Sequence, residues 1–284
     1  MSIGIVGNGF VGGAVAHGFR NHNPLIYDIY PELSPNTLEE VMGCDYVFIC
    51  LPTPMTRPEG GPCNIDILDD FLSRVEYTPN QVLIIKSTVP VGTTRKMAKK
   101  YALGNLIHNP EFLTAANAKE DFVNADRTVI GSPHWDPIIG CGFMDRVIEL
   151  FQNQFPDTPV YPMFSDESEL VKYTANCFLA TKVMFFNEIS KLAENLGINY
   201  EEIMRGVLSD PRINSSHTMV PGPDGNYGFG GTCFPKDINA LIRTMKEYMV
   251  DPKILEAVWE DNLSVREDWD WAESESAVKE NDYS

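Results

Sequence analysis

The sequence predicts an α/β fold in which an N-terminal, doubly wound parallel sheet is followed by an all-helical central domain. Three observations predict it. Short apolar runs alternate with helical stretches as far as residue 130. A glycine-rich turn directly follows the first of these runs, and no glycine or proline interrupts the span 166–196.

The apolar runs have the length of strands and are separated by turn residues or helical stretches. Strands that alternate with helices form a parallel sheet covered on both faces, so ligands are expected at the carboxyl ends of the strands. The runs expected as strands are 3–6, 25–27, 46–51, 82–85, 106–107 and 128–130.

The second half of the chain is expected to be helical. The first helix is roughly 45 Å long at the usual rise per residue, and Gly197 ends it. The second has Asn199 as N-cap and Glu202 as the partner in a capping box. The helices expected here cover 166–196, 200–209, 237–249 and 252–266.

The change of pattern near Ser165 divides the chain into a sheet domain at 1–165 and a helical domain at 166–266. Residues 267–284 form an acidic tail with few aliphatic side chains. Such a tail is expected to fray, or to lean on the surface through Trp269 and Trp271, and no chemistry is assigned to it.

The composition disfavours several classes of function. With 22 Lys and Arg against 40 Asp and Glu, the formal charge of −18 repels nucleic-acid backbones and anionic lipid, so neither is an expected partner. No apolar run approaches the ~20 residues of a bilayer span, and no basic segment precedes the first strand, so a cytoplasmic protein is expected. The six cysteines show no CxxC pair, which favours thiols over disulfides, and no metal site is expected.

The first chemical motif is the turn Gly7-Asn8-Gly9-Phe10-Val11-Gly12, which follows a strand and opens a helix. Its glycines permit a tight turn and the close approach of a pyrophosphate, to which the helix N-terminus presents its N–H groups. Asp28 ends the second strand, where it can accept from a ribose 2′-hydroxyl and repel a 2′-phosphate. A structural turn with a surface Asp is the alternative, but this order of elements favours a Rossmann-type site that prefers NAD.

The second motif is Gly230-Gly231-Thr232-Cys233-Phe234-Pro235-Lys236-Asp237. A lone cysteine is usually a small core residue. Here Cys233 lies between paired glycines and a helix N-terminus and three residues from Lys236, and both positive potentials favour the thiolate. We therefore interpret Cys233 as a nucleophile, whereas Cys44, Cys50 and Cys177 are interpreted as core.

Further polar side chains lie where ligands are expected. Lys172 and Asn176 are four residues apart on the first helix, in a stretch with little solvent-facing surface, and such a pair can stabilise an oxyanion. An exposed Lys and Asn is the alternative. Glu111 follows the fifth strand, where it can act as a general base, and Thr88 offers a hydroxyl after the fourth.

Together these segments resemble the UDP-glucose/GDP-mannose dehydrogenase family, over nearly the whole chain to about Leu241. Each segment alone is a weak signal, whereas the combination is specific. Besides the glycine-rich turn, the resemblance is carried by Phe48-Ile49-Cys50-Leu51-Pro52-Thr53-Pro54, Ser87-Thr88-x-Pro90-x-Gly92, Asn109-Pro110-Glu111-Phe112-Leu113, Asp126-Arg127-x-Val129-Ile130-Gly131, the Lys172/Asn176 helix and the Cys233 motif.

The resemblance implies a four-electron oxidation of a nucleotide-sugar C6 alcohol to the uronate with two NAD. Among such reactions, the conversion of UDP-glucose to UDP-glucuronate is the one expected. The residue matching the family's thioester cysteine is Cys233. Glu111 and Asp237 would handle the water, and Lys172 and Asn176 would hold the oxyanion. The implied product is a precursor for polysaccharide biosynthesis.

The resemblance also implies binding residues and a homodimer whose core is the long helix. Arg212 would reach the sugar nucleotide of the neighbouring subunit. The implied cofactor contacts are Gly7, Gly9, Phe10, Val11, Gly12, Asp28, Pro52, Thr53, Thr88 and Lys236. The implied substrate contacts are Glu111, Phe112, Leu113, Lys172, Asn176, Arg212, Phe229 and Gly230.

Two departures from the family pattern stand out. Thr114-Ala115-Ala116 replaces the usual Arg or Ala followed by Glu-Gly. Only 51 residues follow Cys233, so a short form is expected, without the family's C-terminal nucleotide-binding domain. The loop 221–228 is expected to supply part of the nucleotide contact.

Three alternatives stay open from the sequence: a GDP-mannose or other nucleotide-sugar dehydrogenase, a two-electron hydroxyacid dehydrogenase that needs no thiol, and a non-catalytic nucleotide-binding subunit completed by another chain. The joint presence of the five polar residues Glu111, Lys172, Asn176, Cys233 and Asp237 favours the four-electron reaction. The yield of NADH per substrate distinguishes the alternatives.

Overall fold

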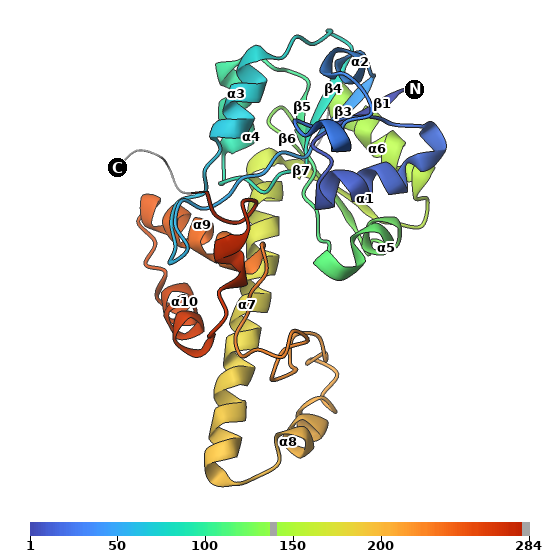
Figure 1. The fold of residues 1–284 in the computed structure, drawn as a ribbon. Coiled ribbons are helices and arrows are strands. Elements are labelled where there is room, and N and C mark those ends of the chain that lie inside the picture. The colour runs from blue at the N-terminus through green and yellow to red at the C-terminus, as the bar shows by residue number, and fades with distance from the viewer. Residues whose placement is uncertain (137–140, 280–284) are drawn as a thin grey trace. The chain divides into compact units, whose positions relative to one another are not determined.

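The computed structural model describes residues 1–136 and 141–279, which form two compact units. The first unit comprises Met1–Thr53 and Asn64–Lys172. The second begins at Tyr173 and includes the segment Pro54–Cys63. The long helix α7, Ser165–Leu196, contributes residues to both units (Figure 1).

The first unit is built on a seven-stranded sheet of order β2-β1-β3-β4-β5-β6-β7. All neighbouring strands are parallel except β5 and β6, which pair antiparallel at His108 and Gly131. An apolar pattern does not encode strand direction, so this reversal was not predicted. The strands are β1 Ile3–Val6, β2 Leu25–Tyr27, β3 Tyr46–Ile49, β4 Val82–Ile85, β5 Leu106–His108, β6 Thr128–Ser132 and β7 Val160–Phe164.

Helices cover both faces of this sheet, which confirms the doubly wound architecture (Figure 1). Alternate residues of β1 face opposite cores: Ile3 and Ile5 pack with α1, α5 and α6, and Val6 packs with α2, α3 and α4. Phe19 centres the first core, with its ring against those of four other phenylalanines. The helices are α1 Phe10–Gly18, α2 Leu38–Met42, α3 Asp66–Arg74, α4 Thr93–Lys100, α5 Ala118–Val123 and α6 Gly142–Gln154.

The expected strands are all present, but β7 was missed. It carries Pro162 and is largely exposed, because it is the edge strand of the sheet. A proline is tolerated on an edge strand and argues against a central one, so the pattern did not indicate a strand.

The second unit is helical as far as the end of α10, as expected: α7 continues into it and is followed by α8 Tyr200–Val207, α9 Phe234–Glu247 and α10 Lys253–Val265. The Asn199 side chain caps α8 as predicted, while the Glu202 carboxylate pairs with Arg205. The start of α9 was expected at Asp237 but lies at Phe234. Pro235 is tolerated in the first turn, because a backbone N–H at that position has no acceptor within the helix and its absence in proline therefore costs no hydrogen bond.

Of the two expectations for the acidic tail, fraying is wrong for residues 267–279. The alternative, contact through the tryptophans, holds, although Trp271 enters the core and does not rest on the surface. Trp271 is fully buried, and its indole N–H donates to the Pro58 carbonyl. Met55 exchanges backbone hydrogen bonds with Ala277 and Lys279. The tail is therefore anchored through Trp271, and together with Pro54–Cys63 it is part of the second unit. Among the described helices, none combines the length and apolarity that a membrane crossing requires.

Candidate active site

The glycine-rich turn at the end of β1 forms a cradle that side chains would fill. A Cβ on Gly12 would lie 1.8 Å from the Gly7 carbonyl oxygen, and Gly7 itself has a φ of +92°. Above Gly9, which precedes α1, a Cβ would meet nothing within 4 Å. Backbone N–H groups at an open helix N-terminus suit a pyrophosphate, so these residues fit a dinucleotide.

Asp28 lies beside this turn, as predicted. One of its carboxylate oxygens accepts from the Asn8 backbone N–H at 2.6 Å, and the other accepts from the Tyr30 N–H at 3.0 Å. The strand order reverses between β1 and β3, which is the usual place for a nucleotide. Asp28 follows β2, the strand on the other side of β1.

The loops after β3 and β4 are tied to each other at the same sheet edge. The Thr53 hydroxyl donates to the Thr88 carbonyl at 2.6 Å, and the Ser87 hydroxyl donates to the Leu51 carbonyl at 2.6 Å. Thr53 and Thr88 are buried, whereas Pro52 is exposed. The expected cofactor-contacting residues of the first unit thus belong to the loops at the carboxyl ends of β1, β2, β3 and β4 or to the first turn of α1.

Lys172 and Glu111 form a buried ion pair in the first unit, with Nζ 2.7 Å from Oε1. The other oxygen of Glu111 accepts from the Leu113 backbone N–H at 2.7 Å. Burial raises the pKa of Glu111, but Lys172, the Leu113 N–H and Lys86 together bring it below its ordinary value. The carboxylate is therefore ionised at neutral pH, which is the form that a general base needs.

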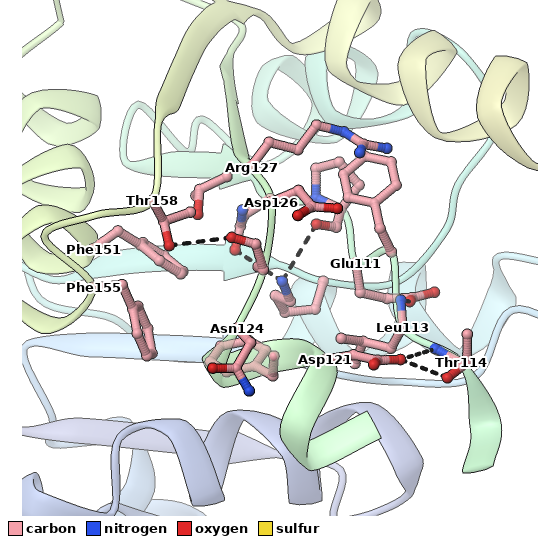
Figure 2. Close-up of a pocket in the computed structure, with 17 residues that line it drawn as sticks. Glu111, Leu113, Thr114, Asp121, Asn124, Asp126, Arg127, Phe151, Phe155 and Thr158 are labelled. Atoms are coloured by element: carbon pink, nitrogen blue, oxygen red, sulfur yellow. Dashed lines mark hydrogen bonds between the residues drawn. The ribbon is translucent and has the colours of Figure 1, made fainter. Parts of the chain in front are cut away.

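Glu111 also borders a cavity of about 240 Å³ that sequence reasoning did not predict (Figure 2). Its lining includes the buried Lys86, whose Nζ donates to the Asn109 side chain at 2.9 Å. Burial lowers the pKa of Lys86 to about 8. Arg127 lies over the Phe112 ring, 4.1 Å from its centroid. The available signal for Lys86 was a lysine closing an apolar strand, since lysine is rarely buried without a partner.

A second polar cluster lies in the second unit. The Asn176 amide donates to Asp237 Oδ2 at 2.6 Å, and Lys236 Nζ donates to Oδ1 at 2.5 Å. All three side chains are buried. The Asp237 carboxylate fixes the amide orientation of Asn176 and pairs with the Lys236 ammonium.

Cys233 is the N-cap residue of α9 and belongs to this cluster. Burial lowers the pKa of Lys236, but the negative charge of Asp237 and those of Cys63 and Cys233 in their thiolate forms outweigh it, so the pKa lies above its ordinary value. A charged ammonium and a helix N-terminus both favour a thiolate at Cys233. Cys63 was not predicted here, because nothing in the sequence shows that Pro54–Cys63 folds with the second unit.

The cysteines interpreted as core differ from Cys233. Cys44 and Cys177 are buried, and burial raises the pKa of both thiols. Burial raises the pKa of Cys50 to about 12. These thiols are therefore protonated at neutral pH and poor nucleophiles. Within residues 1–136 and 141–279, no group of three or more His, Cys, Asp or Glu side chains could hold a metal ion.

The remaining expected substrate contacts have defined surroundings. Phe229 is buried, and Asn262 bonds both its N–H and its carbonyl. Gly230 packs against Arg266 and Asp270. Arg212 is exposed and pairs with Asp210 at 2.6 Å.

The structure thus brings the predicted residues together in two groups, one in each unit. Lys172 and Asn176 lie one turn apart on α7, as expected. The first unit holds the glycine-rich turn, Asp28, Thr53, Thr88, Glu111 and Lys172; the second holds Asn176, Cys233, Lys236 and Asp237.

Comparison with known families finds two matching domains along the chain. Residues 32–152 match the NAD binding domain of the UDP-glucose/GDP-mannose dehydrogenase family, and residues 166–264 match the central domain of the same family.

Individual relatives show the same similarity. The chain is 31% identical to a UDP-glucose 6-dehydrogenase of Rickettsia typhi, over 92% of this chain and 67% of that protein. It is 35% identical to the UDP-glucose 6-dehydrogenase of Rhizobium meliloti, over 76% and 49%. A solved UDP-glucose dehydrogenase from Pyrobaculum islandicum superposes with a TM-score of 0.75 at 26% identity, over 93% and 68%. The chain spans about half to two thirds of the curated relatives it matches.

Proposed function

Because the chain belongs to the UDP-glucose/GDP-mannose dehydrogenase family, we propose that it oxidises a nucleotide-sugar C6 alcohol to the carboxylate, with UDP-glucose as the first substrate to test. The observation that carries the proposal is the cluster around Cys233. A thiol at a helix N-terminus beside a charged lysine is suited to hold an aldehyde covalently, and a simple alcohol dehydrogenase needs no such thiol.

The residues of the second unit supply the covalent chemistry. The C6 alcohol first loses a hydride and its hydroxyl proton, which gives the aldehyde. The Cys233 thiolate then adds to the aldehyde carbon to form a thiohemiacetal anion, and removal of a second hydride from that carbon gives a thioester. Water then cleaves the thioester, releasing the carboxylate and the thiolate. Asp237 is suited to accept the proton of the water, because Asn176 and Lys236 hold its oxygens in place.

Two roles remain, to stabilise the negative charge that develops during the reaction and to accept a proton, and they fall to Lys172, Asn176 and Glu111. An oxygen anion develops when the thiolate adds to the aldehyde and again when water adds to the thioester. The Lys172 ammonium and the Asn176 amide are donors for that anion, and being buried they act more strongly than in water. Glu111, ionised beside Lys172, is the second candidate base.

The first unit is suited to hold NAD. When bound, NAD supplies the hydride acceptor for both oxidations. Gly7, Gly9 and Gly12 leave room for its pyrophosphate, and Asp28 is placed for the ribose. Thr53 and Thr88 fix the neighbouring loops to each other.

The stoichiometry tests the function. The chain, incubated with NAD and a panel of UDP- and GDP-sugars, is expected to form two NADH for each sugar consumed, with a carboxylate product identified by mass spectrometry. One NADH per substrate would instead indicate a two-electron dehydrogenase. No NADH, together with intact NAD binding, would indicate a non-catalytic subunit.

Replacing Asp28 is expected to change the cofactor preference. Asp28→Ala removes a charged acceptor for the ribose hydroxyl, and such a bond contributes about 1.5–3 kcal/mol, or roughly 10–100-fold in NAD affinity. NADP affinity should rise or stay constant, because the repulsion is lost. Titrating both cofactors calorimetrically measures the ratio, with the exposed Glu39→Ala as control. An unchanged NAD to NADP ratio would remove Asp28 from this role.

A homodimer formed along α7 is part of the proposal. Phe178, Phe185, Leu192 and Leu196 are 67%, 54%, 54% and 62% exposed and follow each other at intervals of seven, seven and four residues. They therefore share one side of the helix, and an exposed apolar stripe of this kind marks an interface. Phe185→Asp should shift the chain from dimer to monomer in light scattering, whereas Asn195→Asp on another side should not. A monomeric wild-type chain would contradict the proposal.

A further inference from the structure

The loop that carries Cys233 rests on a residue of the acidic tail. The Gly231 backbone N–H donates to both oxygens of Asp270, at 3.1 and 3.0 Å. Gly231 has a φ of +74°, a conformation that favours glycine. Only Thr232 lies between this anchored amide and Cys233. All of these residues belong to the second unit.

Asp270 is itself held by a buried arginine. Arg266 Nη2 lies 3.2 Å from Asp270 and 2.7 Å from Asp224, and its Nε donates to the Asp268 carbonyl. A Cβ on Gly230 would lie 2.2 Å from Arg266 Nη2 and 2.3 Å from Asp270 Oδ1. The backbone at Gly230 therefore packs directly on the Arg266–Asp270 pair, with no space for a side chain.

The tail segment that presents Asp270 is fixed on both sides. Trp269 donates to the Arg266 carbonyl, and its ring stacks on that of Trp271 at 5.6 Å. Trp271 is fully buried against Trp259 and bonds Pro58. The Asp270 side chain is 40% exposed, but the tryptophans on both sides of it are anchored, so its carboxylate can define the position of the amide that it binds.

We propose that Asp270 is a positioning residue for Cys233: by accepting from the Gly231 N–H it fixes the loop from Gly230 to Cys233 and thereby the place of the nucleophilic sulfur. Arg266 pairs with both Asp270 and Asp224, so the carboxylate next to the thiol motif has a cationic partner. The consequence for turnover rests on the proposed function, whereas the consequence for the position of the thiol does not.

The test compares Asp270→Ala with Asp270→Asn and with Asp268→Ala in the full chain. The rate at which iodoacetamide alkylates Cys233, followed by peptide mass spectrometry, reports the position and ionisation of the thiol. Asp270→Ala should change this rate at least fivefold and lower kcat about tenfold with KM changed less than twofold, because a small misplacement of a reacting group slows the chemical step. Asp270→Asn retains an acceptor for the Gly231 N–H and should stay within threefold of the wild type.

Asp268→Ala is the matched control, since it removes one negative charge two residues away while the Asp268 backbone keeps its contact with Arg266. Thermal melting identifies variants that are folded, and Asp270→Ser serves if Asp270→Ala does not fold. A folded disruptive variant with wild-type alkylation rate and kcat would overturn the inference. If the wild type oxidises no nucleotide sugar, the proposed function fails, while the alkylation series still decides whether Asp270 positions the loop.

Discussion

Cys233→Ser is expected to abolish formation of the carboxylate, with a loss of at least about 10³-fold in rate, as is typical when a nucleophile is removed. A serine hydroxyl at this place is a far weaker nucleophile than a thiolate, and its ester is a poorer acyl donor to water. Any ester that forms should therefore persist. Carboxylate production and adduct mass, both followed by mass spectrometry with UDP-glucose and NAD, measure the effect.

Cys177→Ser is the control for this experiment. Cys177 is buried on α7 and burial raises the pKa of its thiol, so its replacement should affect stability and leave the chemistry intact. NAD affinity should be unchanged in both variants, because neither Cys233 nor Cys177 is among the expected cofactor contacts. Carboxylate formation by Cys233→Ser at the wild-type rate would exclude the thioester mechanism.

Local signals predicted most of the fold. The buried strands of the sheet alternate with helices and have the apolar, strand-length runs that sequence patterns record. The predictions that failed concern two elements whose structure depends on tertiary contacts. The edge strand β7 tolerates Pro162 because only one of its sides is paired. The tail is ordered because the Trp271 side chain is fully buried and its indole N–H donates to the carbonyl of Pro58, 213 residues away in the sequence.

The candidate site was predicted as a set of residues rather than as a network. The sequence indicated that Lys172 and Asn176 share a helix face, but it could not show that each has its own carboxylate partner, Glu111 and Asp237. Lys86 was missed as a site residue because its burial depends on the packing of Asn109 and Phe122 around it. Partners far apart in sequence leave no periodic signal, so only the structure shows them.

Breaking the Lys172–Glu111 pair should have the second large effect. Lys172→Met keeps the apolar stem but leaves the Glu111 carboxylate buried without its cation, which costs about 3–5 kcal/mol of unfolding free energy. Arg95→Met is the control: Arg95 pairs with Asp166 at 2.8 Å but is more than half exposed, so its loss should cost under about 1 kcal/mol. Urea unfolding at pH 7 measures both.

The pH dependence separates the loss of charge pairing from a loss of packing. In the wild type the pKa of Glu111 lies below its ordinary value of 4.5, so its contribution to stability is complete above pH 4.5 and is lost as pH falls through the lower, folded-state pKa. Without Lys172, burial raises that pKa instead, and acid relieves the penalty by protonating the carboxylate. The stability gap between the two proteins should therefore be widest at pH 7 and narrow below about pH 4.5.

A double variant completes the argument. Lys172→Met/Glu111→Gln has no buried charge left at the pair, and replacing both members of a buried pair is often close to neutral, so it should recover most of the stability lost in Lys172→Met. It should not recover carboxylate formation, because both the oxyanion donor and the candidate base are gone. Two results together would show that Lys172 stabilises the chain by packing rather than by charge. The stability difference between the wild type and Lys172→Met would stay constant with pH, and the double variant would be no more stable than Lys172→Met.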